Sequence, residues 1–107
     1  MIYLNTGQGS LMAYSELSDI FSLYLLIIYP NPNNGDFFVQ FMFSDPKELK
    51  INIYDLEGRP VYKESLSPST QSFIHPISLS SELAAGIYLM DVFVEGEGHY
   101  YQRIIKQ

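Results

Sequence analysis

The feature that most constrains the fold is the stretch from Leu83 to Val92, where Leu83, Gly86 and Tyr88 open an alternating segment. A glycine here lets the chain turn sharply into a strand, and a tyrosine two residues later can fold its ring into a core. A buried hydroxyl without a hydrogen-bond partner costs about 1–3 kcal/mol. The spacing therefore predicts a tyrosine corner, in which the phenol bonds to a backbone group a few residues upstream. The alternative is an ordinary strand that begins with a glycine.

Short apolar segments separated by turn residues fill the chain from residue 23 onward. In most of them apolar and polar side chains alternate, which is typical of strands with one buried face. The predicted strands cover residues 23–29, 37–43, 49–54, 61–66, 73–79, 86–94 and 99–106. About seven short strands without a long helix predict an all-β fold, an antiparallel β-sandwich of immunoglobulin or fibronectin-III type.

Three further expectations concern individual strands and turns. The segment 23–29 is apolar on both faces, so we expect a strand that is buried on both sides. Pro60 at the start of one strand indicates an edge strand, and Pro76 within another indicates an edge or switching strand, because proline has no backbone donor. The turn from Asp55 to Gly58 is predicted to be a hairpin loop with Gly58 in the left-handed conformation.

The loop that follows the first strand is rich in proline and asparagine. Its prolines remove backbone donors, and Asn34-Gly35 favours a tight turn. Asn31, Asn33 and Asp36 offer oxygen ligands, but a single carboxylate does not fit a calcium loop, so we expect no metal here.

Composition bounds the organisation of the chain. Its 107 residues suffice for one core, which we assign to residues 23–107, with residues 1–22 as an irregular lead-in from a linker or an upstream protein. The net charge of −6 argues against nucleic-acid binding, and the absence of cysteine excludes disulfides. The longest apolar run, residues 23–29, is shorter than the ~20 residues of a membrane span. No basic residue precedes it, so we expect neither a signal peptide nor a membrane anchor.

No constellation for catalysis is visible. His75 and His99 are not spaced as metal ligands, and no serine lies in a Gly-x-Ser-x-Gly motif. The carboxylates that are candidates for a catalytic pair fall mostly in predicted turns, where we expect them to serve solubility: Asp55, Glu57, Asp91, Glu95 and Glu97. We therefore expect no enzyme activity, no cofactor and no small-molecule substrate.

Four segments together resemble a known family: residues 29–37, 49–61, 83–89 and 103–106. In this order, and at the C-terminus, they resemble the C-terminal sorting domains carried by cargo of the type IX (Por) secretion system of Bacteroidetes, type A. The resemblance covers about residues 25–107 and implies a seven-stranded immunoglobulin-like sandwich.

The resemblance implies that the domain is an address for export. Cargo of this family passes through the periplasm and is engaged by the type IX outer-membrane machinery. A sortase-like peptidase then typically removes the domain, and the cargo is attached to the cell surface or released. Because such domains follow a signal peptide and a long cargo, the resemblance also leads us to expect that this chain is a fragment or the product of a shortened gene.

The resemblance also assigns residues. Those implied in the sorting signal are Gly86, Tyr88, Arg103, Ile104, Ile105 and Lys106, and those in the family's turn motifs are Pro30, Asn31, Pro32, Gly35, Asp55 and Gly58. We expect a receptor to add contacts along the last strand, with the basic side chains of Arg103 and Lys106 displayed to it. The alternative function is a structural or adhesive module that binds carbohydrate by stacking sugars on Tyr62, Tyr100 and Tyr101.

Overall fold

The structure is a computed structural model that describes residues 22–107, so the lead-in predicted for residues 1–22 lies, except for Ser22, outside the described residues. The described part is built of strands, with no helix among residues 22–107. The strands are β1 (Leu23–Tyr29), β2 (Asp36–Phe43), β3 (Leu49–Asp55), β4 (Pro60–Leu66), β5 (Ser72–Ser78), β6 (Gly86–Val94) and β7 (Gly98–Lys106).

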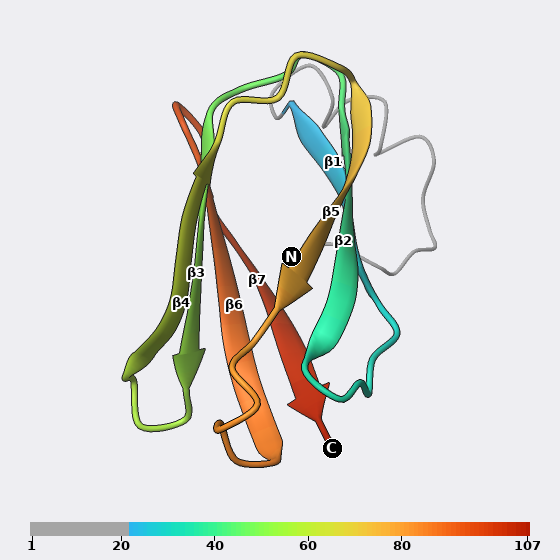
Figure 1. Cartoon of the computed structure of the whole chain (residues 1–107). Helices are drawn as coiled ribbons and strands as arrows, with labels where there is room; N and C mark the ends of the chain where they lie inside the picture. Colours follow the sequence, from blue (N-terminus) through green and yellow to red (C-terminus); the bar gives the residue numbers. More distant parts are fainter. Residues whose placement is uncertain (1–21) are drawn as a thin grey trace, which may run out of the picture.

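The strands form two antiparallel sheets that face each other (Figure 1). One sheet has the order β1-β2-β5 and the other the order β4-β3-β6-β7. The predicted all-β sandwich is therefore confirmed. Pro60 and Pro76 lie in β4 and β5, which are both sheet edges, as their missing backbone donors predict.

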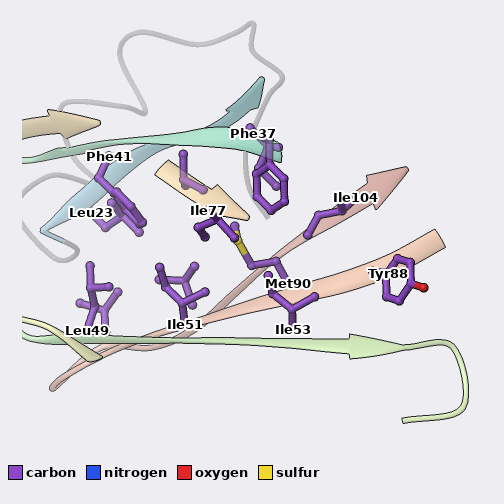
Figure 2. Close-up of a cluster of buried hydrophobic side chains, with 14 of the residues drawn as sticks. Leu23, Phe37, Phe41, Leu49, Ile51, Ile53, Ile77, Tyr88, Met90 and Ile104 are labelled. Atoms are coloured by element: carbon purple, nitrogen blue, oxygen red, sulfur yellow. The ribbon is translucent and has the colours of Figure 1, made fainter. Parts of the chain in front are cut away.

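The core lies between the sheets, where alternate residues of β2, β3, β6 and β7 point inward (Figure 2). Val39 and Phe41 of β2 are 0% exposed, as are Ile51 of β3 and Met90 of β6. Each such side chain stabilises the fold by about 1.5–3 kcal/mol relative to an exposed one. Ile104 of β7 is also 0% exposed, so the last strand contributes directly to the core.

The expectation that β1 is buried on both sides is wrong. Ile27 and Tyr29 are 41% and 37% exposed, and the Tyr29 ring lies beside that of Phe38, with ring centroids 5.8 Å apart. The physical reason is that β1 is an edge strand of a two-layer fold, in which one face of each sheet contacts the other sheet. The described residues include no helix long and apolar enough to cross a membrane.

Side-chain hydrogen bonds link the two sheets along one of the two long sides of the sandwich. On this side the edge strands β4 and β5 meet, and His75 Nε2 lies 2.8 Å from Glu64 Oε1. Tyr62 donates a second hydrogen bond to the same carboxylate oxygen. Burial raises the pKa of Glu64, but the hydrogen bonds from Tyr62 and His75 outweigh it, so the pKa lies below its ordinary value. The opposite side, where β1 and β7 meet, is closed by the contacts described next.

Candidate recognition edge at the last strand

The hairpin of β6 and β7 begins with a buried tyrosine. Tyr88 is 5% exposed, and its hydroxyl donates a 2.6 Å hydrogen bond to the carbonyl oxygen of Ala84, four residues upstream. Gly86 between them has a φ of +152°, which side chains rarely adopt. Leu83, at the start of the turn, packs against the core. The bend into β6 is thus fixed by one backbone conformation and one side-chain hydrogen bond.

The two basic residues near the end of β7 occupy different environments. Arg103 is exposed and has no carboxylate partner among residues 22–107. Lys106 is 8% exposed, and its Nζ donates a 3.0 Å hydrogen bond to the carbonyl of Leu83. The expectation that both cations are displayed is therefore wrong for Lys106. Because β7 residues with even numbers point inward, position 106 faces the other sheet.

The loop of residues 30–35, which we call the Pro-Asn loop, binds the outer edge of β7. The backbone N–H of Asn33 donates to the Ile105 carbonyl at 2.9 Å, and the N–H of Gln107 donates to the Asn33 carbonyl at 2.7 Å. These two bonds make a parallel bridge between residue 33 and residue 106. One residue of the loop therefore acts as a short extra strand beside β7.

The side chain of Asn31 extends this contact toward the middle of β7. Its Nδ2 donates to the Arg103 carbonyl and its Oδ1 accepts from the Ile105 N–H, both at 2.8 Å. An asparagine amide carries one donor and one acceptor at the spacing of a peptide group, so it can pair with a strand edge as backbone does. The Pro-Asn loop thus covers the outer edge of β7 from Arg103 to Gln107.

Contacts within the loop and beneath it hold this shape. Asn33 is 5% exposed, and its side chain donates to the Pro30 carbonyl at 3.0 Å and accepts from the Gly35 N–H at 2.8 Å. Pro30 and Pro32 both follow cis peptide bonds. Gly35 has a φ of +110°, and a Cβ there would lie 3.0 Å from Cε of Lys106. The buried lysine therefore passes directly under the loop, and glycine leaves room for it.

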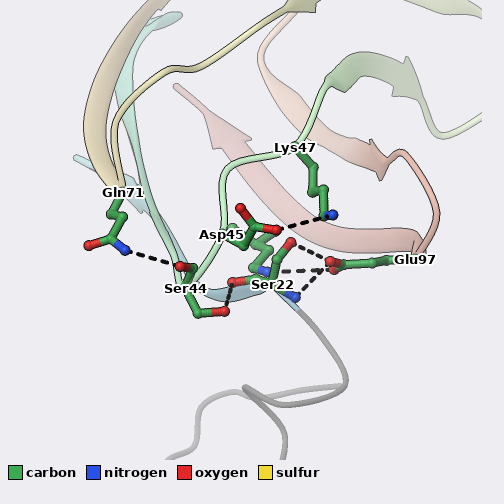
Figure 3. A network of polar contacts seen from close by, with 7 residues as sticks. Ser22, Ser44, Asp45, Lys47, Gln71 and Glu97 are labelled. Atoms are coloured by element: carbon green, nitrogen blue, oxygen red, sulfur yellow. Dashed lines mark hydrogen bonds and ion pairs between the residues drawn. The ribbon is translucent and has the colours of Figure 1, made fainter.

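Glu97, in the turn between β6 and β7, binds the start of β1 at the other end of the sandwich (Figure 3). Its Oε2 accepts hydrogen bonds from the backbone N–H of Ser22, at 2.6 Å, and from the Ser22 hydroxyl. Its Oε1 accepts from the hydroxyl of Tyr100 at 3.0 Å, and burial together with this bond raises the pKa of that phenol. Sequence reasoning assigned Glu97 to solubility, which is wrong, because a turn position does not reveal a partner 75 residues away.

The remaining family turn residues lie in the hairpin of β3 and β4. Gly58 has a φ of +86°, so its predicted left-handed conformation is confirmed. The Asp55 carboxylate accepts hydrogen bonds from the backbone N–H groups of Glu57 and Arg59, each at 2.9 Å. The backbone bond from Arg59 is the main cause that holds the pKa of Asp55 below its ordinary value. This carboxylate therefore shapes its own turn.

The three tyrosines considered for sugar stacking do not share a surface. Tyr101 points outward from β7 and is 57% exposed. Tyr100 points the other way and bonds to Glu97, while Tyr62 lies in β4 and bonds to Glu64. On the outer face of the hairpin, the His99 ring stacks on Tyr101 with centroids 6.0 Å apart, and its Nδ1 lies 2.8 Å from Oδ1 of the buried Asp91. No group of three or more histidine, cysteine or acidic side chains within residues 22–107 is arranged to hold a metal ion.

Comparison with solved structures found distant likenesses. They include β-glucuronidase from Ruminococcus gnavus as the apo enzyme and in complex with D-glucaro 1,5-lactone or D-glucuronic acid, each with 14% sequence identity and a TM-score of 0.46. Each match covers 79% of this chain and 16% of that enzyme chain, so the chain spans a small part of those proteins. Nothing about activity transfers at this level of similarity. A search of curated proteins found no match.

A family model gives the decisive comparison. The model described as "Secretion system C-terminal sorting domain" matches residues 27–107, which is most of the chain and includes the Pro-Asn loop and both strands of the last hairpin. This family consists of secretion signals and is not an enzyme family. The chain therefore belongs to the C-terminal sorting domains of the type IX secretion system.

Proposed function

We propose that residues 23–107 direct a cargo protein through the outer membrane and are then removed by a sortase-like peptidase, with residues 1–22 as the linker to that cargo. The domain acts without catalysis. In transit it is periplasmic, and its cargo ends on the outer-membrane surface or outside the cell. The partners are the type IX outer-membrane machinery and the peptidase.

One observation carries the proposal: the family match runs to the last residue and includes all of β7. In the fold, β7 is an edge strand, so a receptor can approach its outer side without opening a sheet. Gly86 and Tyr88 set the bend that positions the hairpin, while Ile104 and Lys106 anchor its end in the core. We therefore propose that these four residues hold the signal in position. Arg103 and Ile105 then lie on its outer side, which a receptor can approach.

Fusion of the whole chain behind a periplasm-directed reporter tests the proposal. We expect the reporter on the surface or in the medium of a bacterium with a working type IX system, and in the periplasm of the matched strain that lacks the system. A family sorting domain known to work in that host serves as the positive control. The proposal fails if the positive control carries the reporter out while this chain leaves it in the periplasm.

A further inference from the structure

We infer that the outer edge of β7 from His99 to Arg103, called here the open edge, is where an extended segment of the outer-membrane machinery adds to the sheet as a further strand. This inference rests on the proposed function, and it specifies which backbone groups the partner uses. It also assigns the Pro-Asn loop the role of ending that added strand.

The direction of the backbone groups follows from the observed bonds. Ile105 directs both its N–H and its carbonyl outward, to Asn31 and Asn33. The pairing of β6 with β7 runs without a register shift from Gly86↔Lys106 to Val94↔Gly98. Because outward and inward groups alternate along a strand, residues 99, 101 and 103 also direct their backbone groups outward.

Some of these outward-directed backbone groups have no hydrogen-bond partner among the described residues. The Arg103 carbonyl is bonded to Asn31, but no described residue bonds to the outward backbone groups of His99 and Tyr101 or to the Arg103 N–H. Free donors and acceptors at the spacing of a strand are what an added strand requires.

β7 differs from the other long edges of the fold. The edge strands β4 and β5 contain Pro60 and Pro76, and the edge strand β1 has a register shift between Leu23 and Leu25, whereas β7 has neither a proline nor a register shift in its nine residues. Proteins usually protect an edge of this length with proline, a bulge or a covering segment. Here the covering segment is the Pro-Asn loop, which reaches only from Arg103 onward.

The fold itself shows that this edge accepts an extended segment. Asn33 already pairs with β7 as a one-residue parallel strand. A partner segment on the open edge would continue the same row of hydrogen bonds and would end where Asn31 occupies the Arg103 carbonyl.

The side chains beside the open edge define the chemistry of the partner. Tyr101 is 57% exposed and its ring stacks on His99, so the outer face offers an aromatic surface. Arg103 is an exposed cation without a carboxylate partner in the described part of the chain, on a protein of net charge −6. The complementary segment is therefore extended, with an apolar or aromatic residue beside Tyr101 and an acidic residue beside Arg103.

Comparing proline with threonine at position 101 separates the contribution of the backbone N–H from that of the side chain. Tyr101→Pro removes one outward N–H without removing a bond to β6, and Tyr101→Thr removes the ring but keeps the N–H. Lys63→Pro is the matched control on the edge strand β4. Lys63 lies opposite Asn52, whose backbone groups are directed to β6 in the register set by the bond from the Glu95 N–H to the Glu48 carbonyl, so the Lys63 N–H also points outward. Each variant is made in the whole chain fused to the reporter, and its thermal unfolding is measured in parallel.

We expect Tyr101→Pro to lower export about tenfold relative to Tyr101→Thr, because the partner's carbonyl loses its donor. Lys63→Pro should export like the unsubstituted fusion. If the unsubstituted fusion is exported and Tyr101→Pro, folded, is exported as well as Tyr101→Thr, strand addition is overturned while the sorting function stands. If the unsubstituted fusion is not exported, the proposed function itself fails.

Photo-crosslinking provides a measurement that does not depend on the proline variant folding. A photoreactive amino acid at position 101 should crosslink to an outer-membrane protein in the exporting strain, and one at position 63 should not. Absence of a crosslink from position 101, or equal crosslinking from position 63, would overturn the inference.

Discussion

At the scale of single residues, the asparagines of the Pro-Asn loop take the place of a neighbouring strand. Asn31 uses its side-chain amide, and Asn33 uses its backbone, to pair with the same stretch of β7. In the sequence both were considered as oxygen ligands of a metal ion, and that interpretation was rejected because the loop has a single carboxylate. Nothing in the local pattern indicates that they bind a strand more than 70 residues away, because that contact depends on how the sheets face each other.

Replacing Asn31 tests the contribution of this amide. Asn31→Ala removes two exposed hydrogen bonds, to the Ile105 N–H and the Arg103 carbonyl, so we expect a loss of about 0.5–1.5 kcal/mol for each in the free energy of unfolding. Amide hydrogen exchange should become faster at Ile105 while it stays unchanged at Tyr101. Asn34→Ala, which removes a bond only to the exposed Asp36 N–H, is the control and should cost less. Equal stability of the two variants would contradict the prediction.

Glu64 should make stability depend on pH. Its folded pKa is below the ordinary value because the bonds from Tyr62 and His75 outweigh burial, so its stabilising contribution is present above the unfolded pKa and is lost as pH falls through the folded pKa. We expect the free energy of unfolding to decrease as pH falls below about 5, past the ordinary pKa of 4.5 and through the lower folded pKa, and we expect Glu64→Gln to reduce that decrease.

Urea unfolding at several pH values measures this effect. Glu82→Gln, at an exposed turn position, is the control and should keep the unsubstituted profile. A Glu64→Gln profile parallel to that of the unsubstituted chain would show that the Tyr62–Glu64–His75 contact does not supply the pH dependence.

At the scale of elements, alternation and proline positions were sufficient to predict the strands and two of the sheet edges. β1 and β6 have the predicted bounds, and the others differ by about one residue at an end. Alternation shows which faces of a strand differ, but it does not show whether a second layer covers a face. This is why the apolar outer residues Ile27 and Tyr29 of β1 were wrongly expected to be buried.

The candidate site was predictable only in part. The spacing of Leu83, Gly86 and Tyr88 indicates a bend with a bonded phenol, since all its parts are local in sequence. The contacts of the Pro-Asn loop and of Glu97 with distant strands were not predictable, because they depend on the register between sheets.

Glycine substitution tests how tightly the Pro-Asn loop lies on Lys106. Gly35→Ala should be strongly destabilising, because it adds a strained φ of +110° and a contact at 3.0 Å with the Lys106 side chain. Gly58→Ala has a φ of +86° but open space around the added Cβ, so it should cost only the backbone strain. Thermal unfolding of both variants measures the difference. An equal loss of stability in the two variants would mean that the Lys106 side chain moves aside at no cost in free energy.

At the scale of the whole molecule, the last strand and the turn before it join both ends of β1 to the rest of the fold. Glu97 holds Ser22 at the start of β1, and residues 103–107 hold the Pro-Asn loop that follows it. The residues that we propose for the sorting signal at the end of β7 therefore also help to close the sandwich.

Deletion of residues 103–107 should abolish cooperative unfolding. It removes the buried Ile104 and Lys106 and leaves the Pro-Asn loop without its partner. Calorimetry should show the loss of a single transition, whereas Arg103→Ala, which removes only an exposed side chain, should keep it. A truncated chain with an intact transition would contradict this view. If the prediction holds, loss of export on truncation reports unfolding as well as loss of the signal.

The parallel course of β1 and β7 has a mechanical consequence. Ser22 lies beside the turn that begins β7, and the loop after β1 lies beside the end of β7, so residues 22 and 107 are at opposite ends of the long axis (Figure 1). Tension applied between the proposed cargo ahead of residue 22 and the C-terminus would load the four hydrogen bonds between the Pro-Asn loop and residues 103–107 together in shear, instead of breaking them one at a time. Such an arrangement resists pulling along its length, and this would suit the proposed role of the domain in carrying a cargo out of the cell.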